Sequence, residues 1–149
     1  NHTWFFKLKK NPTISDNITN MNLKNEIRDF KNGAILLTRE VENPEDFGVA
    51  IFENKTITGV IEKPKNPPSN VAIGGIYLFD EQFWERLDIV QSKPNFSISD
   101  VTMQYIAEGS AKILSVGEYT WVDCGTPRGL IHASKLLQSG EFTPPEGMR

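Results

Sequence analysis

Glu62 and Lys63 form a charged pair directly before Pro64. Successive side chains of a strand point to opposite faces, so both charges can enter one pocket only if the strand ends at this pair. Pro64 favours such an end, because it has no N–H for the sheet and holds the preceding residue extended. A carboxylate accepts hydrogen bonds from sugar hydroxyls and an ammonium neutralises a phosphate, so the pair suits a sugar phosphate. The alternative is an exposed strand end with two solvated charges.

A pair of glycines, Gly74-Gly75, interrupts a segment that is otherwise rich in Val, Ile and Tyr and typical of a strand. Each glycine in a strand costs about 0.5–1 kcal/mol relative to a residue with a side chain, so a compensating role is expected. Missing side chains allow a ligand or another backbone to approach closely. The alternative is a β-bulge.

The segment TWVDCGTP, residues 120–127, places Trp121 and Asp123 on one face of a short strand, because strand side chains alternate. Asp123 then lies at the carboxyl end of a strand and just before a helix, where ligands of α/β sheets and anions bind. Its carboxylate is either a cap for the following amides or a hard oxygen ligand for Mg²⁺. Asp16 has the same ambiguity, and a lone aspartate in a polar turn is commonly a turn former.

Several other chemistries lack the residues they require. The single cysteine, Cys124, excludes an intrachain disulfide and a cysteine-based zinc site, and it fits a reducing compartment, so a cytoplasmic location is expected. His2 and His132 have no Cys, Asp or Glu at ligand spacing. The sequence also has no G-x-S-x-G, H-E-x-x-H or P-loop motif, which argues against hydrolase, zinc-protease and Walker-type functions.

The composition is that of a soluble globular domain. The 149 residues are 38% hydrophobic and 23% charged, with a formal net charge of −3, so no general attraction to nucleic acid or anionic lipid is expected. No apolar run approaches the roughly 20 residues of a membrane span. One domain with a single core is therefore expected, without nucleic-acid or membrane partners.

Helices and strands are predicted to alternate along the chain. Hydrophobic periodicity and capping residues predict helices from 20 or 22 to about 32, after Asp80, at 97–109 and at 126–140. Strands are expected at 34–41, 49–53, 56–62, 70–79, 112–116 and 119–122, and residues 54–55 form a hairpin turn. Residues 1–14 show no usable periodicity and are left unassigned. The pattern favours an α/β or α+β fold with a mixed sheet covered by helices.

Four segments in this order resemble the sugar nucleotidyltransferases, and most closely the glucose-1-phosphate thymidylyltransferases. They are ENPEDFGVAIFE, VIEKPKNPPSNVAIGGIYLFD, the S-x-S-D helix start and YTWVDCGTPRGLIHAS. The resemblance covers about residues 15–138. It implies the α/β class, with a mixed, mostly parallel sheet flanked by helices, as in a truncated Rossmann-like nucleotidyltransferase fold.

The resemblance also implies an activity and assigns residues to it. The family makes a nucleotide-sugar and pyrophosphate from a sugar 1-phosphate and a nucleoside triphosphate, here most closely dTDP-glucose from dTTP, with Mg²⁺ as cofactor. The sugar-phosphate pocket would be lined by Gly48, Glu62, Lys63, Ile73, Gly74, Gly75 and Trp121, with Glu62 on sugar hydroxyls and Lys63 on the phosphate. Asp16, which matches the aspartate of the family's G-D-N segment, and Asp123 would both ligate Mg²⁺.

The resemblance has limits within these 149 residues. Nothing in them matches the G-x-G-T-R-L loop or the P-K segment that hold the triphosphate and supply the catalytic arginine and lysine of the family. Ser15 replaces the usual glycine before Asp16, and NFSISD replaces a glutamate-containing helix start. Residues 15–140 are therefore expected to form the C-terminal, sugar-phosphate-binding part of a nucleotidyltransferase domain, with residues 1–14 unassigned and 141–149 as a tail. No catalytic residue is expected in this chain, which alone would be inactive.

Two other interpretations remain open. The chain could be a non-catalytic sugar-phosphate-binding or assembly module derived from such an enzyme. It could also be a structural fragment that needs a partner, in which case sheet edges lacking their neighbours should lead to self-association, as a homo-oligomer, or to residues 1–14 substituting as a strand.

Overall fold

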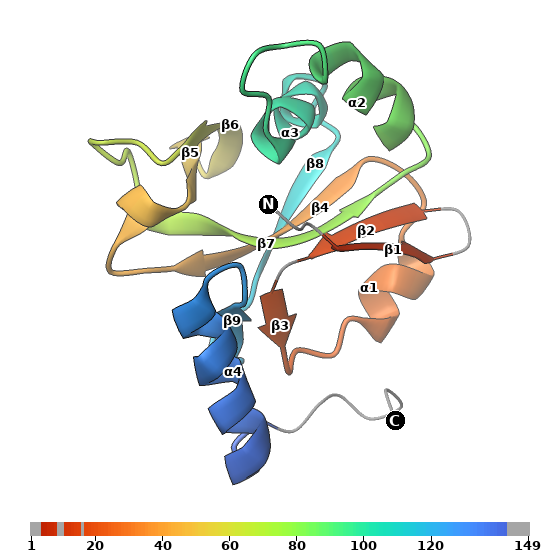
Figure 1. Cartoon of the computed structure of the whole chain (residues 1–149). Helices are drawn as coiled ribbons and strands as arrows, with labels where there is room; N and C mark the ends of the chain where they lie inside the picture. The colour runs from red at the N-terminus through yellow and green to blue at the C-terminus, as the bar shows by residue number, and fades with distance from the viewer. Residues whose placement is uncertain (1–3, 9–10, 16, 143–149) are drawn as a thin grey trace.

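The computed structural model of the chain describes residues 4–8, 11–15 and 17–142 (Figure 1). A seven-stranded sheet runs through the middle of the protein. Its strands are β1 (Trp4–Leu8), β2 (Asn11–Ser15), β4 (Ala34–Glu40), β5 (Gly48–Glu53), β6 (Thr56–Glu62), β7 (Val71–Phe79) and β8 (Ala111–Ser115). The order along the sheet is β1-β2-β7-β4-β8, and the β5–β6 hairpin is attached to β7. Two further strands, β3 (Asn17–Thr19) and β9 (Trp121–Asp123), pair with each other.

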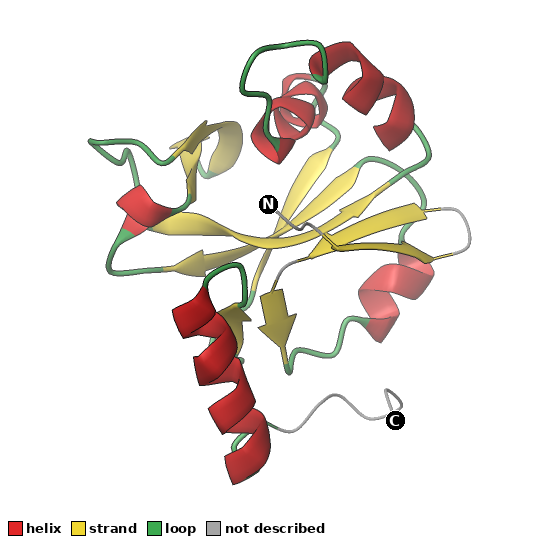
Figure 2. Ribbon diagram, viewed as in Figure 1, coloured by secondary structure: helices red, strands yellow, loops and turns green. Residues whose placement is uncertain are grey.

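Helices cover both faces of this sheet, as Figure 2 shows by colour. They are α1 (Lys24–Asp29), α2 (Phe83–Val90), α3 (Ile98–Ala107) and α4 (Pro127–Ser139), with a 3-10 turn at Pro44–Asp46. Helices α2 and α3 lie on one side of the sheet and α1 on the other, while α4 follows β9 (Figure 1). In the described part of the chain, no helix has both the length and the apolar character needed to cross a bilayer.

The alternation of side chains along β4 divides the core in two. Ala34 and Leu36 belong to the core beneath α2 and α3, together with Phe83 of α2 and Tyr105 of α3. The neighbouring residue Leu37 instead lies in the second core, on the α1 side. Because successive strand residues face opposite ways, one strand contributes to both cores. We call the two sides the α2/α3 face and the α1 face.

The mixed α/β class is confirmed, but the expectation of a mostly parallel sheet is wrong for the described strands. Strands β4 and β8 are parallel, and all other pairs of described strands are antiparallel. Parallel neighbours require a crossover of about a dozen residues or more, whereas antiparallel neighbours can be joined by a tight turn. Strands β1–β2 and β5–β6 are joined by such short connections and must therefore be antiparallel.

Local sequence signals explain several elements. Asn54 and Lys55 both have positive φ, 49° and 66°, as the two-residue turn between β5 and β6 requires. Thr126 caps α4 by accepting a hydrogen bond from the Gly129 N–H at 3.0 Å, and Gly140 ends this helix in the left-handed conformation. These predictions are confirmed.

Helix α1 is shorter than its hydrophobic pattern predicts. Residues 17–19 form β3, and the Met21 N–H then bonds to the Thr19 hydroxyl at 3.1 Å in a turn that precedes the helix. At the other end Phe30 is already extended, with φ −68° and ψ 124°. The predicted helix from 20 or 22 to about 32 is therefore wrong at both ends, because pairing of β3 with β9 and the approach to β4 override the local pattern.

Residues left unassigned at the start of the sequence supply strands. Strand β2 pairs antiparallel with β7 and β1 pairs with β2, so the edge of β7 that faces away from β4 is covered. The start of the chain thus forms a strand, β2, whereas self-association stays a prediction.

Asp80 connects the ends of several elements on the α2/α3 face. Its side chain, in a residue only 7% exposed, accepts hydrogen bonds from the Gly33 N–H at 2.6 Å, the Tyr105 hydroxyl at 2.8 Å and the Gln82 N–H at 3.1 Å. The N-cap residue of α2 is Gln82, and the Gln82 N–H donates to Asp80. Asp80 therefore supports the start of this helix from a position two residues before the N-cap. Burial of Tyr105 and its bond to Asp80 raise the pKa of this phenol.

Candidate functional site

The charged pair predicted from the sequence lies at the end of β6. This strand ends at Glu62, as predicted, and Glu62 pairs with Gly48 at the start of β5. The Lys63 N–H donates to the Phe47 carbonyl at 2.9 Å. Gly48, Glu62 and Lys63 are thus brought together where the β5–β6 hairpin begins.

Glu62 is held by a serine of the neighbouring helix. The hydroxyl of Ser99, a residue of α3 that is 8% exposed, donates to Glu62 Oε2 at 3.0 Å. A methyl group added at Gly48 would lie 3.2 Å from the same oxygen, so the glycine leaves room for the carboxylate. Glu62 itself is exposed. Its carboxylate is therefore oriented by the protein and remains open to hydrogen-bond donors from solution.

Lys63 does not have the extended conformation expected before Pro64. Its φ is +44°, in the left-handed region, which is uncommon for a residue other than glycine. Pro64 is buried, and the Lys63 N–H is engaged by Phe47, so the chain has to turn sharply between the strand and the proline. The expectation of an extended Lys63 is wrong, but the turn changes the direction of the chain at this pair, as a shared pocket requires.

The two glycines in β7 form a bulge and also make room for a tryptophan. Between β4 and β7 the register shifts so that residues 74–76 stand against Leu37 alone, and Gly75 has φ +61°. A methyl group at Gly74 would lie 3.2 Å from the Leu37 carbonyl oxygen and 3.4 Å from Trp121 Nε1. Both interpretations of these glycines are thus supported: the strand bulges, and another part of the protein approaches closely.

Trp121 joins the glycine bulge to the charged pair. Its indole Nε1 donates to the Gly74 carbonyl at 2.8 Å, which fixes the ring over β7. The same ring packs against Phe47, with centroids 5.6 Å apart and an interplanar angle of 50°. Since Phe47 also binds the Lys63 backbone, a chain of contacts runs from Lys63 to Gly74. Ile73, 5% exposed, precedes the bulge within the α2/α3 core.

Asp123 lies at the end of β9, two residues after Trp121 and on the same face of the strand. Its Oδ1 accepts a hydrogen bond from the Gly125 N–H at 2.8 Å, so the predicted role in the turn before α4 is observed. Gly129 is required next to it, because a side chain there would collide with the Asp123 carbonyl. Among the described residues, no hydrogen bond or ion pair joins the side chains of Glu62 or Lys63 to Asp123.

Asp16, the second predicted magnesium ligand, lies outside the described residues. The next residue, Asn17, is the strand partner of Asp123 in the β3–β9 pair. Within the described ranges there is no group of three or more His, Cys, Asp or Glu that could hold a metal. Mg²⁺, however, is commonly bound by one or two carboxylates together with substrate phosphates and water. The hard oxygen of Asp123 is suitable for such a site, while the role of Asp16 stays a prediction.

Two residues that hold this site were not predicted. Ser99 orients Glu62, and Phe47 connects Lys63 with Trp121. Phe47 directly precedes Gly48, and Ser99 lies in the S-x-S-D helix start, so both were in segments already singled out. Their partners are 37 and 74 positions away in sequence (99 − 62 and 121 − 47), and only the fold reveals these contacts.

Comparisons with known proteins identify the family of this chain. The family model described as Nucleotidyl transferase matches residues 4–140. A glucose-1-phosphate thymidylyltransferase from Neisseria meningitidis is 34% identical over 113 residues, which cover 72% of this chain and 38% of that protein. The low-salt glycan biosynthesis nucleotidyltransferase Agl11 from Haloferax volcanii is 29% identical over 130 residues, covering 83% of this chain and 36% of that protein.

A solved structure gives the same result for the fold. The crystal structure of a presumed glucose-1-phosphate thymidylyltransferase from Bacillus anthracis, in complex with a sucrose, superposes with a TM-score of 0.76 and 29% sequence identity. The match covers 93% of this chain and 60% of that chain. The chain spans little more than a third of the length of the two curated relatives.

Proposed function

Since this chain belongs to the nucleotidyl transferase family, we propose that it is the sugar-phosphate-binding part of a sugar nucleotidyltransferase. The complete enzyme would join glucose 1-phosphate to the nucleotidyl group of dTTP and form dTDP-glucose and pyrophosphate. A phosphate oxygen of the sugar phosphate attacks the α-phosphorus, the bond between the α-phosphorus and the bridging oxygen to the β-phosphorus breaks, and pyrophosphate leaves. The thymidylyltransferase name of the Neisseria relative supports this choice of substrates.

One observation carries the proposal: the oriented carboxylate of Glu62 stands beside Lys63 at the open end of the β5–β6 hairpin. The Ser99 hydroxyl at 3.0 Å fixes the carboxylate, which can then accept hydrogen bonds from sugar hydroxyls. The neighbouring Lys63 ammonium supplies the positive charge that a phosphate requires. Gly48 keeps the space beside the carboxylate free.

The remaining predicted residues would shape the rest of the pocket. Trp121 offers an apolar surface to the sugar, and its ring is fixed by the Gly74 carbonyl. The backbone of Ile73 to Gly75 can approach the ligand because the bulge carries no side chains at positions 74 and 75. These residues would bind and orient the sugar phosphate for in-line attack, which is the main contribution of a protein to phosphoryl transfer.

We assign Asp123 and Asp16 as the residues that would hold Mg²⁺. When bound, this ion would neutralise the charge on the reacting phosphates. The hydrogen bond from the Gly125 N–H keeps the Asp123 carboxylate at the start of α4, and strand pairing places Asn17, the residue after Asp16, opposite Asp123. The nucleophile is already an anion, so the chain needs no general base for this reaction.

The proposal is tested by calorimetric titration of the 149-residue chain with glucose 1-phosphate. Lys63→Ala should weaken binding by about tenfold or more, because a charge-assisted contact to the phosphate is lost. Lys55→Ala is the matched control, since Lys55 is an exposed lysine at the opposite end of the same hairpin, and it should bind like the parent. Equal binding by the Lys63 and Lys55 variants, or no binding by the parent chain at about 10 mM ligand, would contradict the proposal.

A second measurement separates binding from turnover. The 149 residues contain no G-x-G-T-R-L loop, so with glucose 1-phosphate, dTTP and Mg²⁺ the chain alone should release no pyrophosphate. Binding without turnover is the expected result. Pyrophosphate release by the pure chain would show that these residues suffice for catalysis and would contradict the assignment of this chain as the sugar-phosphate-binding part only.

A further inference from the structure

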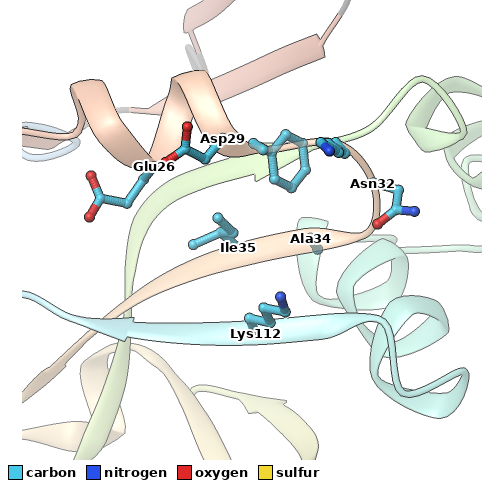
Figure 3. Close-up of a pocket in the computed structure, with 8 residues that line it drawn as sticks. Glu26, Asp29, Asn32, Ala34, Ile35 and Lys112 are labelled. Atoms are coloured by element: carbon cyan, nitrogen blue, oxygen red, sulfur yellow. The ribbon is translucent and has the colours of Figure 1, made fainter.

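A cavity of about 340 Å³ lies between α1 and the strands β4 and β8, on the α1 face of the sheet (Figure 3). Helix α1 contributes Glu26 and Asp29, the following segment Phe30 and Lys31, β4 Ile35 and β8 Lys112. The volume is near the lower end of the range for small-molecule sites, which is roughly 300–1,000 Å³. None of the described residues of the candidate sugar-phosphate site lines this cavity.

The cavity follows from the short length of α1. Ile35 and Lys112 are direct partners in the parallel β4–β8 pair, so their side chains lie on the same face of the sheet. Figure 3 shows Lys112 extending from β8 towards the side on which α1 lies. Because α1 ends at Asp29 and Phe30 is already extended, no further helical turn covers the start of β4 and the edge strand β8. The hollow remains open beside two strands.

The charges of Glu26, Asp29, Lys31 and Lys112, which line the cavity, cancel, and one positive charge is in excess when Arg28 is counted with Asp29. Asp29 is bound by Arg28 through two hydrogen bonds, of 2.7 and 3.0 Å, and this contact lowers the pKa of the Asp29 carboxyl. Lys31 and Lys112 are exposed, and neither forms an ion pair with another described residue. Two ammonium groups that border one cavity without a carboxylate partner are suited to an anion such as phosphate.

Beside the charged groups, the lining includes Glu26 and two apolar side chains. The Oε2 atom of Glu26 is buried and has no hydrogen-bond partner, although the residue lines the cavity. A buried acceptor without a donor costs roughly 1–3 kcal/mol, and this oxygen is too enclosed to be reached by a ligand in the cavity. Phe30 and Ile35 are partly buried side chains that pack against the core of the α1 face. They add an apolar surface on which a flat ring can lie.

We propose that this cavity binds a nucleoside 5′-monophosphate. The phosphate would lie between Lys31 and Lys112, the base would pack on Phe30, and the ribose would join them. The two lysines suit a dianion and Phe30 suits an aromatic ring, and a mononucleotide combines these two groups in one small molecule. Base identity is not selected, because stacking on an aromatic side chain tolerates every base.

The test is calorimetric titration of the 149-residue chain with AMP, with adenosine and inorganic phosphate as partial ligands. AMP should bind at least about tenfold more tightly than either partial ligand, since each lacks one of the two groups that make contact. The double variant Lys31→Ala, Lys112→Ala should weaken AMP binding by about tenfold or more. Both lysines are exposed, so the variant should keep the circular dichroism and melting temperature of the parent chain.

Two single variants distinguish this cavity from the candidate sugar-phosphate site. Lys55→Ala and Lys63→Ala should leave AMP binding unchanged, and the double lysine variant should leave glucose 1-phosphate binding unchanged. Loss of AMP binding in the Lys63 variant would place the nucleotide at the sugar-phosphate site and overturn the proposal. Absence of AMP binding to the parent chain at about 10 mM would overturn it as well, without bearing on glucose 1-phosphate binding.

Discussion

The two faces of the sheet differ in whether a buried carboxylate oxygen has a hydrogen-bond partner. On the α2/α3 face both oxygens of Asp80 are engaged, by the Gly33 N–H on one side and by Tyr105 and Gln82 on the other. On the α1 face Glu26 has a buried oxygen without a partner. The carboxylate on the α2/α3 face is therefore satisfied by the protein itself, whereas the carboxylate on the α1 face keeps a buried oxygen without a partner.

The lengths of the covering helices explain this difference. Helices α2 and α3 have 8 and 10 residues and bury Phe83, Val101 and Tyr105 against the sheet. Helix α1 has 6 residues and no buried residue of its own. The longer helices also place Arg86 over the Tyr105 ring, with its guanidinium 4.1 Å from the ring centroid, and bind it to Glu108. One Arg86 N–H, at Nε, lacks an acceptor even there.

The candidate site combines the properties of the two faces. Glu62 is fixed by Ser99, which belongs to α3 and thus to the well-packed α2/α3 face. Trp121 packs against the core of the α1 face. A binding residue whose rotamer is fixed by a rigid element loses less entropy when the ligand binds. The site therefore lies where a rigid support meets a surface that is still open.

The largest expected effect comes from the same carboxylate-to-amide change on the two faces. Asp80→Asn should lower the free energy of unfolding by about 3 kcal/mol, because an amide nitrogen would replace one of the two carboxylate oxygens that accept from Gly33, Tyr105 and Gln82. Glu26→Gln should change it by less than about 0.5 kcal/mol, since no hydrogen bond to the buried oxygen is lost. Urea unfolding followed by circular dichroism measures both values. Similar values for the two variants would break the contrast between the faces.

A smaller effect is expected from adding a methyl group at the bulge that supports the site. Gly74→Ala should destabilise the protein by about 1–2 kcal/mol, because the new carbon meets the Leu37 carbonyl and the Trp121 ring, and neither can move freely. It should also weaken glucose 1-phosphate binding, since Trp121 must shift.

Gly59→Ala is the control for this change. There the added carbon would lie 3.1 Å from the end of the flexible Ile51 side chain, which can move, and the loss should stay within about 0.5 kcal/mol. Both variants are compared by thermal unfolding and by tryptophan fluorescence. A Gly74 variant as stable as the Gly59 variant, with unchanged fluorescence, would show that the bulge is not tightly packed against Trp121.

The smallest effect concerns the exposed edge of the α2/α3 face. Arg86 donates to both oxygens of Glu108, at 2.8 and 2.6 Å, and lowers the pKa of this carboxyl below its ordinary value of 4.5. A lowered folded-state pKa contributes stability that is present above the unfolded-state pKa and is lost as the pH falls through the folded-state value. Urea midpoints of the parent chain should therefore decrease between about pH 5 and pH 3 more steeply than those of Glu108→Gln. The exposed Glu85→Gln should keep the parent slope, and equal slopes for all three proteins would contradict this assignment.

Much of the fold could be predicted from local signals. The cap at Thr126, the stop at Gly140 and the two-residue turn at Asn54-Lys55 are set by side chains and backbone preferences within a few residues, so these boundaries were predicted correctly. The ends of α1 and the strands at residues 4–15 could not be predicted in this way, because pairing with β9 and β7 decides them. The direction of neighbouring strands likewise depends on distant pairing.

The candidate site likewise has features that the sequence could predict and features that it could not. The sequence alone indicated six positions of the site by their residue types: 62, 63, 74, 75, 121 and 123. Charges beside a proline and glycines inside a strand carry a free-energy cost, so a functional role is expected there. What the sequence could not show is that Ser99 would orient Glu62 or that Phe47 would connect Lys63 with Trp121. These contacts join residues far apart in the chain, and no local preference encodes them.

The amino-acid sequence alone determined the boundaries that local caps and turns set, such as Thr126 and Asn54-Lys55, which positions lack side chains and which kinds of chemistry are available. These properties depend on a few neighbouring residues and on the atoms of each side chain. Only the tertiary structure decided that the α2/α3 face would satisfy its buried carboxylate and that the α1 face would leave a cavity between Lys31 and Lys112. The hydrogen-bond partners of a buried group come from elements distant in sequence. The length of a helix that covers the sheet also depends on how those elements pack.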